Sequence, residues 1–369
     1  MKSPICIPTV LIALAIISSI HAKEATSSNW MSKAGYGLMA HYEVFGVDKI
    51  SPKEYNRRVN SFNVDSFVKQ VKESGTEYVI LTLGQNSGYY CAPNRTYDKL
   101  LGIEPGQKTA TRDLPLELGK ALQKENIRLV LYLPSRAPQR DRKTMNALGD
   151  TPQNKPAPQV FIKNWSHICQ EWSERYGKLV SGWWFDGYYI PAGWANLQAQ
   201  HNWKTWAEAV RAGNSDAELA FNRGASADVA FIRLNGAQTY TAGEATQIGA
   251  TPKTHPPPEG MTWQLLTYLG HTWGKGTKPR YGADELIPYL DKVNALGGSV
   301  TFDVPLSSEG AIPESFMTVL RKLGKKHKQL TPLSKEKRRQ GSCKAESRCR
   351  TNACRSDFEI RAKRGFRSV

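Results

Sequence analysis

One pattern repeats between about residues 36 and 322: a short apolar run that ends in polar or aromatic residues, followed by an amphipathic run. The apolar runs are rich in β-branched and aromatic residues, which favour strands. The amphipathic runs place apolar residues three and four apart, as Phe67, Val68 and Val71 are placed, which is typical of a helix face. This alternation predicts an α/β protein with a parallel sheet and right-handed crossovers. The expected strands cover residues 37–41, 78–83, 128–133, 181–186, 218–222, 237–242 and 299–303.

The number of these units decides between two α/β architectures. About eight strand units in about 290 residues fit a closed (β/α)8 barrel of TIM type, which typically takes about 250 residues. The alternative is an open doubly wound sheet, but neither G-x-G-x-x-G nor G-x-x-x-x-G-K-[ST] follows the first strand. We therefore predict a (β/α)8 barrel over residues 30–323, in which residues 261–269 are not assigned to strand or helix. The expected helices cover residues 64–74, 114–125, 160–176, 203–211, 284–296 and 314–323.

Residues 1–22 have the features of a secretory signal peptide. Lys2 gives a positive start, an uncharged and mainly apolar run follows, and small residues precede a cut after Ala22. The alternative is a membrane anchor, but the apolar run is shorter than the roughly 20 residues that a spanning helix needs. The sequence therefore predicts a secreted or periplasmic protein with no membrane span.

The positive charge of the chain is concentrated near its end. The chain carries 50 Lys and Arg against 33 Asp and Glu, but residues 321–369 hold 17 of the basic residues and only 4 of the acidic ones. Apolar periodicity is lost from Gly324 onward, so residues 324–369 are expected to form a disordered basic tail. This tail is either a solvated extension or an arm that binds an anionic polysaccharide. The rest of the chain is nearly neutral and has no base-reading module, so no nucleic-acid partner is expected.

Neither the cysteines nor the histidines follow a metal-binding pattern. Five cysteines remain after the signal peptide, Cys91 and Cys169 in the expected barrel and three in the tail, and no pairing can be deduced for them. Six histidines remain, without an H-x-x-H or H-x-x-x-H pair. The sequence therefore supports neither a metal nor another cofactor.

Polar and aromatic side chains follow the expected strands at their carboxyl ends, where barrel enzymes have their active sites. Aromatic rings stack on the C–H faces of sugars, and two carboxylates can share the cleavage of a glycosidic bond. The polar residues are His41, Glu43, Gln85, Asn86, Arg136, Asp186, Asn222, Arg223, Glu244 and Asp303, and the aromatic ones are Tyr42, Tyr89, Tyr90, Trp183, Trp184, Tyr188, Tyr189 and Trp273. This rim predicts a sugar-binding site.

Asp186 is the sharpest catalytic candidate of the rim. The apolar residues 183–185 deliver it to the end of a strand, and Gly187 allows a tight turn after it. The alternative is a structural aspartate that binds backbone N–H groups as a helix cap or strand end.

The ordered set of these segments resembles the α-L-fucosidases of glycoside hydrolase family 29. Residues 184–187, Trp-Phe-Asp-Gly, are similar to the nucleophile strand of that family, and residues 239–244 resemble the segment that carries the general acid in many members. The other similar segments are residues 36–42, 71–82, 112–113, 128–132, 263, 272–274 and 297–310. The resemblance covers nearly the whole expected barrel.

The resemblance implies a retaining exo-hydrolase that releases a terminal fucose-like sugar. Asp186 would be the nucleophile and Glu244 the general acid, with Glu43 and Asp303 as the other candidates for the acid. The residues that would bind the substrate are His41, Tyr42, Glu43, Gln85, Asn86, Trp184, Tyr188 and Trp273.

The chain also departs from the family pattern. A Lys-His-His-Asp-Gly type motif usually ends the second strand, where this chain reads Gly84-Gln85-Asn86-Ser87-Gly88, and Gln264 stands where the family often has Glu. Amide side chains can still hydrogen-bond to sugar hydroxyls. The β-sandwich that usually follows the barrel is replaced by the basic tail. A barrel that binds glycans without cleaving them, or a glycosidase for another sugar, therefore remains the alternative.

Overall fold

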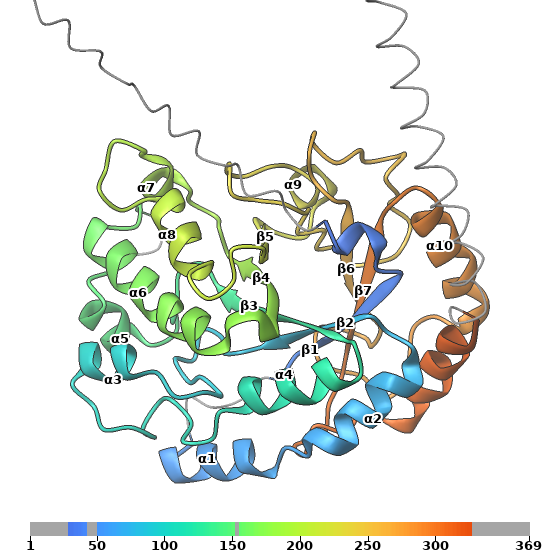
Figure 1. Cartoon of the computed structure of the whole chain (residues 1–369), viewed down its shortest axis with the longest axis horizontal. Helices are drawn as coiled ribbons and strands as arrows, with labels where there is room; N and C mark the ends of the chain where they lie inside the picture. Colours follow the sequence, from blue (N-terminus) through green and yellow to red (C-terminus); the bar gives the residue numbers. More distant parts are fainter. Residues whose placement is uncertain (1–28, 43–49, 152–154, 327–369) are drawn as a thin grey trace, which may run out of the picture.

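The computed structural model describes residues 29–42, 50–151 and 155–326. Within these residues, seven parallel strands form one sheet in the order β5-β4-β3-β2-β1-β7-β6, which curls so that helices cover its outer face (Figure 1). All strand pairs are parallel, as the alternation predicts. The strands are β1 (Tyr36–Ala40), β2 (Tyr78–Thr82), β3 (Arg128–Pro134), β4 (Val180–Asp186), β5 (Glu218–Phe221), β6 (Gln264–Tyr268) and β7 (Ser299–Val304).

An extended segment, residues 239–245, joins the two edges of this sheet. Thr239 N donates to Leu219 O of β5 (2.9 Å), and Leu266 N of β6 donates to Gly243 O (2.8 Å). The segment therefore occupies the sixth of eight positions and closes the ring. The predicted (β/α)8 barrel is confirmed, with one position irregular.

Side-chain hydroxyls explain why the expected strand over residues 237–242 is not regular. Thr239 Oγ1 accepts a hydrogen bond from Leu219 N (2.9 Å), and Thr241 Oγ1 both accepts from Gln264 N and donates to Gln264 O (2.8 Å each). These hydroxyls replace part of the backbone ladder. The unassigned residues 261–269 contain β6.

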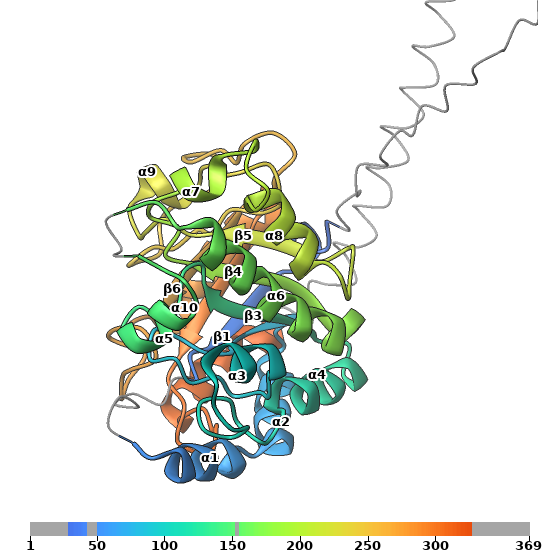
Figure 2. The same ribbon diagram turned by 90° about the vertical axis from the view of Figure 1, so that its left-hand side faces the viewer.

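The helices begin and end largely where the sequence predicts them. α2 (Val64–Ser74) has the predicted bounds, and α4 (Leu114–Lys124) begins with the predicted cap, since Asp113 accepts a hydrogen bond from Leu116 N (3.2 Å). The other labelled helices are η1 (Met31–Lys33), α1 (Pro52–Ser61), α3 (Arg95–Leu101), α5 (Arg142–Ala147), α6 (Gln159–Tyr176), η3 (Gly177–Leu179), α7 (Ala192–Ala195), α8 (Trp203–Val210), α9 (Ala227–Ala230) and α10 (Ala283–Ala295). α7 and α9, which follow β4 and β5, lie at the same end of the molecule (Figures 1 and 2).

A last helix covers residues 314–326, so it continues three residues beyond the predicted end of the barrel domain. Its Gly324 lies directly on the end of α2, where an added Cβ would be 2.2 Å from Ser74 O.

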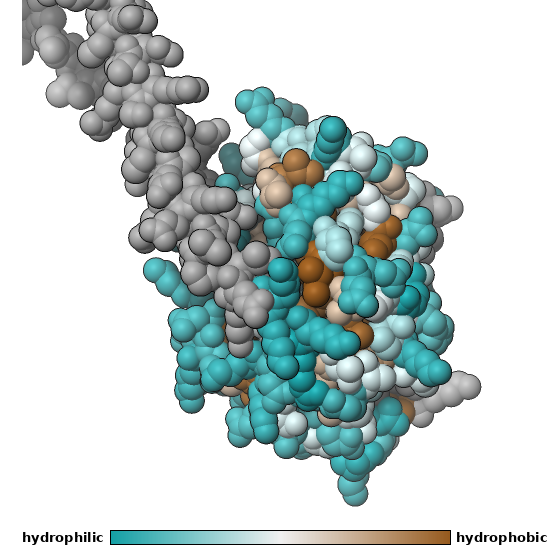
Figure 3. Space-filling model, turned by 90° about the vertical axis from the view of Figure 1, so that its right-hand side faces the viewer, coloured by the Kyte–Doolittle hydropathy of each residue, from teal (hydrophilic) through white to brown (hydrophobic). Residues whose placement is uncertain are grey.

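The outer face on the side of α10 is mainly hydrophilic, with small and separate apolar spots (Figure 3).

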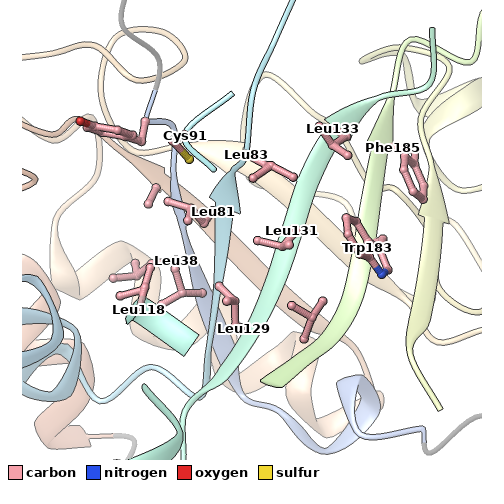
Figure 4. Packing of buried hydrophobic residues seen from close by; sticks show 14 of the residues in the cluster. Leu38, Leu81, Leu83, Cys91, Leu118, Leu129, Leu131, Leu133, Trp183 and Phe185 are labelled. Atoms are coloured by element: carbon pink, nitrogen blue, oxygen red, sulfur yellow. The ribbon is translucent and has the colours of Figure 1, made fainter. Parts of the chain in front are cut away.

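The alternation of side chains along each strand divides the core into two parts. Outward-facing residues such as Leu81, Leu131 and Phe185 pack under the helices, and Figure 4 shows this layer across β2, β3 and β4. Inward-facing residues such as Ile80, Val130 and Trp184 fill the barrel interior. The barrel is therefore a packed core with an open mouth only at one end.

Trp30 and Tyr78 close the other end of the barrel. Their rings meet edge to face with centroids 5.4 Å apart. The Tyr78 hydroxyl lies within hydrogen-bond distance of Ser299 Oγ (3.0 Å) and Thr301 Oγ1 (2.7 Å). The ring of Tyr78 also fills the space beside Gly37, where a Cβ would come within 2.2 Å of it. The barrel interior is thus closed at the amino ends of its strands.

Several sequence predictions concern residues outside the described part. The signal peptide, Glu43 and nearly all of the basic tail lie there. Within the described residues, Cys91 and Cys169 are buried free thiols, and no helix is long and apolar enough to cross a membrane.

Candidate active site

Two carboxylates meet at the open mouth of the barrel. Asp186 ends β4, and the inward direction of Trp184 two residues earlier gives its side chain the same inward direction. Glu244 comes from the irregular sixth position, where it bridges to Leu266 of β6. The two residues are therefore two strand positions apart around the ring.

The amide of Asn222, directly after β5, joins these carboxylates. Its Nδ2 donates to Asp186 Oδ1 (2.8 Å) and to Glu244 Oε2 (2.5 Å). Asn222 is fully buried and its backbone is held on β4, since Asn222 N donates to Phe185 O (2.7 Å). The barrel thus places a rigid neutral donor between two acidic groups.

The other oxygen of Asp186 is held from β3. Tyr132 Oη donates to Asp186 Oδ2 (2.6 Å), and Gln85 Nε2 in turn donates to Tyr132 Oη. Asn86 N donates to Gln85 Oε1 (3.0 Å), which sets the orientation of that amide. Gln85 can only donate to the phenol oxygen here, so the phenol proton is directed to Asp186.

The turn after β4 adds another donor to Asp186. Gly187 N donates to Asp186 Oδ1 (2.8 Å). Gly187 has a φ of 70°, a left-handed conformation that glycine adopts without strain. The predicted tight turn is present, and Asp186 accepts hydrogen bonds at both oxygens.

The environment of Glu244 raises the pKa of this carboxyl, so that it holds its proton to a much higher pH than an exposed glutamate does. Burial is the main cause, and the charge of Asp186 adds to it, while the Asn222 hydrogen bond and His41 act in the opposite direction. The net result of these opposing effects is that the pKa of Glu244 is raised from 4.5 to about 7. Such a carboxyl can give a proton at neutral pH, which is the property of a general acid.

His41 and Asp303 form the opposite wall of the mouth. His41 Nδ1 lies 3.6 Å from Asp303 Oδ1, and Gly274 N donates to Asp303 Oδ2 (2.5 Å). Asp303, which is almost fully buried, thus holds His41 and the loop that carries the half-buried Trp273. As a candidate acid it is therefore less suitable than Glu244, because its oxygens face these neighbours.

Three of the predicted substrate-binding residues have other surroundings. Tyr42 is buried among helices, where its hydroxyl donates to Arg58 O (3.0 Å). Trp184 lies below the carboxylates and stacks on Tyr132, with ring centroids 5.3 Å apart. The Tyr188 ring is buried between Trp194 and Phe221. All three rings are therefore buried in the protein, and the sequence alone did not reveal which way they turn.

Two more rim residues have roles that the sequence left open. Arg136 forms a buried pair with Asp150 (2.5 Å from Nη2 to Oδ1), so it fixes the loop after β3. Asn86 Oδ1 accepts from Gln139 N (3.3 Å), which leaves its amide group at the edge of the mouth. His41, Asn86 and Trp273 remain candidates for contact with a substrate.

The sequence alone does not reveal the place of Tyr132 in the site or the full role of Asn222. Asn222 is one of the polar strand ends that the sequence predicts, but its contact with both carboxylates depends on closure of the barrel. Tyr132 falls within the expected strand of residues 128–133. The signal that points to Tyr132 is the alternation of side chains along the strand. Val130 faces the barrel interior, and residues two apart on a strand face the same side. Among the described residues no group of three His, Cys, Asp or Glu could hold a metal ion.

Comparisons with solved structures show the same architecture elsewhere. The endo-fucoidan hydrolase MfFcnA4 from glycoside hydrolase family 107 is 16% identical with a TM-score of 0.59, over 81% of this chain and 53% of that one. P5AFcnA, another endo-fucoidan hydrolase of that family, is 13% identical with a TM-score of 0.60, over 81% and 92%. The alpha-L-fucosidase AlfC from Lactobacillus casei, in complex with its alpha-L-fucose product, is 18% identical with a TM-score of 0.57, over 82% and 98%.

At these identities the likeness is one of fold, and this chain spans about half the length of MfFcnA4. No curated protein matches the chain. The sequence model described as Alpha-L-fucosidase, in contrast, matches residues 17–329, which include the whole described barrel and both carboxylates. This chain therefore belongs to the alpha-L-fucosidase family, a family of glycoside hydrolases.

Proposed function

We propose that this protein is a retaining exo-glycosidase that releases a terminal α-L-fucose, or a similarly configured sugar, from glycans. Asp186 is the nucleophile, and Glu244 is the general acid and base. The observation that carries this proposal is the contact of one Asn222 nitrogen with both carboxyl groups, at 2.8 and 2.5 Å.

That contact limits the separation of the two carboxyl groups. Their nearest oxygens are at most about 5.3 Å apart, the sum of the two distances to Asn222 Nδ2. Retaining glycosidases have carboxyl groups about 5–5.5 Å apart, whereas inverting enzymes need about 6.5–9.5 Å to admit a water molecule. The spacing therefore favours a retaining mechanism.

The reaction follows from the protonation of the two groups. Asp186 attacks the anomeric carbon while Glu244 gives its proton to the glycosidic oxygen, which leaves with the bonding electron pair. Glu244, now ionised, takes a proton from water as that water attacks the same carbon, and Asp186 leaves as a carboxylate. The negative charge thus moves from Asp186 to Glu244 and back. Asn222 contacts both groups, so it can stabilise the charge at either place.

The pH dependence follows from Glu244. Its pKa of about 7 leaves it protonated below neutral pH and ionised above. Because the first step needs the proton, we expect kcat/KM to fall as the pH rises through about 7. A pH profile in which kcat/KM keeps rising well above this value would contradict the assignment of Glu244.

This protein would recognise the sugar with other residues than the histidine motif that the family usually has. Gln85 is engaged with Tyr132 and Asn86, so the direct sugar contacts are assigned to His41, Asn86 and Trp273. Support for fucose as the sugar comes from membership of the alpha-L-fucosidase family.

The experiment is hydrolysis of nitrophenyl α-L-fucoside by the wild type and Asp186→Gly. We expect the variant to lose activity and to regain turnover with azide, which replaces the missing nucleophile and gives a glycosyl azide of inverted configuration. Asp216→Asn, an exposed carboxylate before β5, is the matched control and should keep full activity. Full activity of Asp186→Gly without azide would overturn the mechanism. Glycan binding without turnover would favour a non-catalytic barrel, and turnover of other aryl glycosides alone would favour another sugar.

We also propose that the protein is exported, on the support of the signal-like residues 1–22. Amino-terminal sequencing of the protein from the medium or periplasm should give a start at Lys23. Recovery of the uncut chain from the cytoplasm alone would contradict this proposal.

A further inference from the structure

A hollow of about 330 Å³ lies beside Asp186, between the loops that follow β2, β3 and β4. Its lining includes Asn86, Gln139, Asp186, Tyr189 and Trp194. The proposed function uses Asp186, Gly187 and Asn86 of this lining but gives no role to Gln139, Tyr189 and Trp194.

The order of the strands places the hollow on one side of Asp186 and Glu244 on the other. The lining residues that the structure describes all come from the β2, β3 and β4 ends of the ring. Glu244 lies in the opposite direction, past β5, and does not line the hollow. The hollow is therefore separated from the general acid by the nucleophile.

This separation decides which part of a substrate the hollow can take. The leaving group departs from the face of the sugar that the general acid protonates, so it must lie on the Glu244 side. A group in the hollow must instead be joined to the reacting sugar through one of its other ring positions. The hollow is thus a place for an extension of the sugar that becomes bound to Asp186, and not for the leaving group.

The lining has the chemistry of a saccharide subsite. The ring of Tyr189 is 59% exposed at the edge of the hollow, and the charge of Asp186, the largest cause, raises the pKa of Tyr189 to about 12. That hydroxyl is therefore a neutral donor close to the nucleophile. Asn86 and Gln139 supply amides, and the buried Trp194 forms an apolar base.

Among the described lining residues, the one cation, Arg136, is already neutralised. Arg136 bonds to Asp150 through Nε and Nη2, and Nη1 donates to Lys155 O (2.7 Å). With this cation paired, the hollow offers aromatic, amide and hydroxyl groups, which suit a neutral sugar better than an anion.

We propose that this hollow is a subsite for a second neutral sugar unit, joined to the sugar that Asp186 attacks. The inference rests on the proposed function but goes beyond it, because an enzyme with this subsite also cleaves a glycan whose reacting sugar carries a further unit. Tyr189 stacks on that unit and Gln139 hydrogen-bonds to its hydroxyls, while Asn86 keeps its proposed contact with the reacting sugar.

The test compares nitrophenyl α-L-fucoside with nitrophenyl α-L-difucosides in which the second fucose occupies different ring hydroxyls of the reacting sugar. We expect at least one difucoside to be cleaved with the disaccharide released intact, and with kcat/KM about tenfold higher than for the monosaccharide, as one stacking contact provides. Cleavage of the monosaccharide alone would overturn this inference and leave the proposed function standing.

Variants of the lining show whether the hollow itself is responsible. Tyr189→Ala and Gln139→Ala should each lower the ratio of difucoside to monosaccharide kcat/KM several-fold. Leu296→Ala, an exposed apolar residue that follows α10 at the opposite end of the barrel, should leave the ratio unchanged. An unchanged ratio in both lining variants would overturn the assignment of the hollow.

A binding measurement decides the case in which no substrate is turned over. That result would remove the proposed function, and titration with free difucosides would then test the hollow separately. Binding to the wild type that Tyr189→Ala weakens would support a saccharide subsite, and absence of binding would overturn it.

Discussion

Asp186 is held by donors from three different strand ends: Tyr132 of β3, Gly187 after β4 and Asn222 after β5. The hydrogen bonds fix the carboxylate in one orientation before a substrate arrives, which is how an active site lowers the cost of reaching the transition state. Gln85 acts through Tyr132, because its amide can only donate to the phenol oxygen. Gln85, which stands where the family's motif has a histidine, therefore helps to hold Asp186 in place through Tyr132.

The first residue-scale prediction concerns this support. Tyr132→Phe removes a hydrogen bond to a charged group, so we expect kcat on nitrophenyl α-L-fucoside to fall about 10- to 100-fold, with less effect on KM. Gln85→Leu should cost less, and the double variant should cost little more than Tyr132→Phe alone, because both changes interrupt one path.

Steady-state kinetics of the three variants check this prediction. Tyr240→Phe is the matched control, because it removes a buried hydroxyl of the barrel interior that donates to Trp183 O (3.0 Å), away from the carboxylates. Fully additive losses in the double variant would show that Gln85 and Tyr132 act separately.

The second prediction at this scale concerns stability and Glu244. Its pKa is raised from 4.5 to about 7 in the folded state, so the folded chain binds the proton more tightly than the unfolded chain does. Stability is therefore unaffected below pH 4.5, falls between the two values, and stays lower above about pH 7. The loss is on the order of 3 kcal/mol.

Glu244→Gln removes this titration and should be more stable than the wild type at about pH 8 but not at about pH 4, as urea unfolding at the two pH values measures. The same variant should lose most of its activity, because glutamine has no proton to give. Equal stability differences at both pH values would mean that the raised pKa has another origin.

At the scale of elements, the sixth position of the barrel both closes the ring and carries the proposed general acid. The segment of residues 239–245 replaces backbone hydrogen bonds by threonine hydroxyls, and it carries Glu244 at its end. Gly243 allows the segment to approach β6 closely, since an added Cβ would be 1.9 Å from Gln264 O. A regular strand with a larger residue here could not bring Glu244 to the same place.

This close approach predicts a difference between two glycine substitutions. Gly243 and Gly297 both have left-handed backbones, with φ of 65° and 79°, but a Cβ on Gly297 would have no atom within 4 Å. Gly297→Ala should therefore cost only the left-handed conformation, about 1–2 kcal/mol.

Gly243→Ala should cost more than Gly297→Ala and should also lower kcat, because the backbone before Glu244 must move. Thermal unfolding and kinetics measured side by side test this. Equal losses of stability with unchanged kcat in both variants would contradict the positioning role of Gly243.

At the scale of the whole molecule, only about half of the net charge of +17 lies in residues that the structure does not describe. The barrel ends with the helix of residues 314–326, which packs on α2 through Gly324. We propose that the basic residues beyond it hold the protein on an anionic polysaccharide. A chain cut at Leu323 would lose packing of this helix, so the cut belongs after Lys326.

The prediction is that truncation after Lys326 sharply lowers the salt concentration at which the protein elutes from a heparin column, because clustered basic charges dominate such binding. Thermal unfolding and hydrolysis of nitrophenyl α-L-fucoside serve as controls and should stay unchanged. Unaltered retention would show that the barrel itself binds heparin.

The amino-acid sequence by itself determined the alternation of strands and helices, most of their bounds and the place of Asp186, because local spacing and turn residues carry this information. It did not determine the partners of Asp186. Asn222, Tyr132 and Glu244 belong to separate strand positions, and only closure of the ring brings them together.

The direction of single side chains was also decided by the tertiary structure. The sequence predicts three sugar-binding aromatic residues that the structure shows to be buried: Tyr42, Trp184 and Tyr188. Burying an aromatic ring is strongly favourable wherever packing allows it, and only the arrangement of the neighbouring elements decides whether a ring at a strand end faces the core or the substrate.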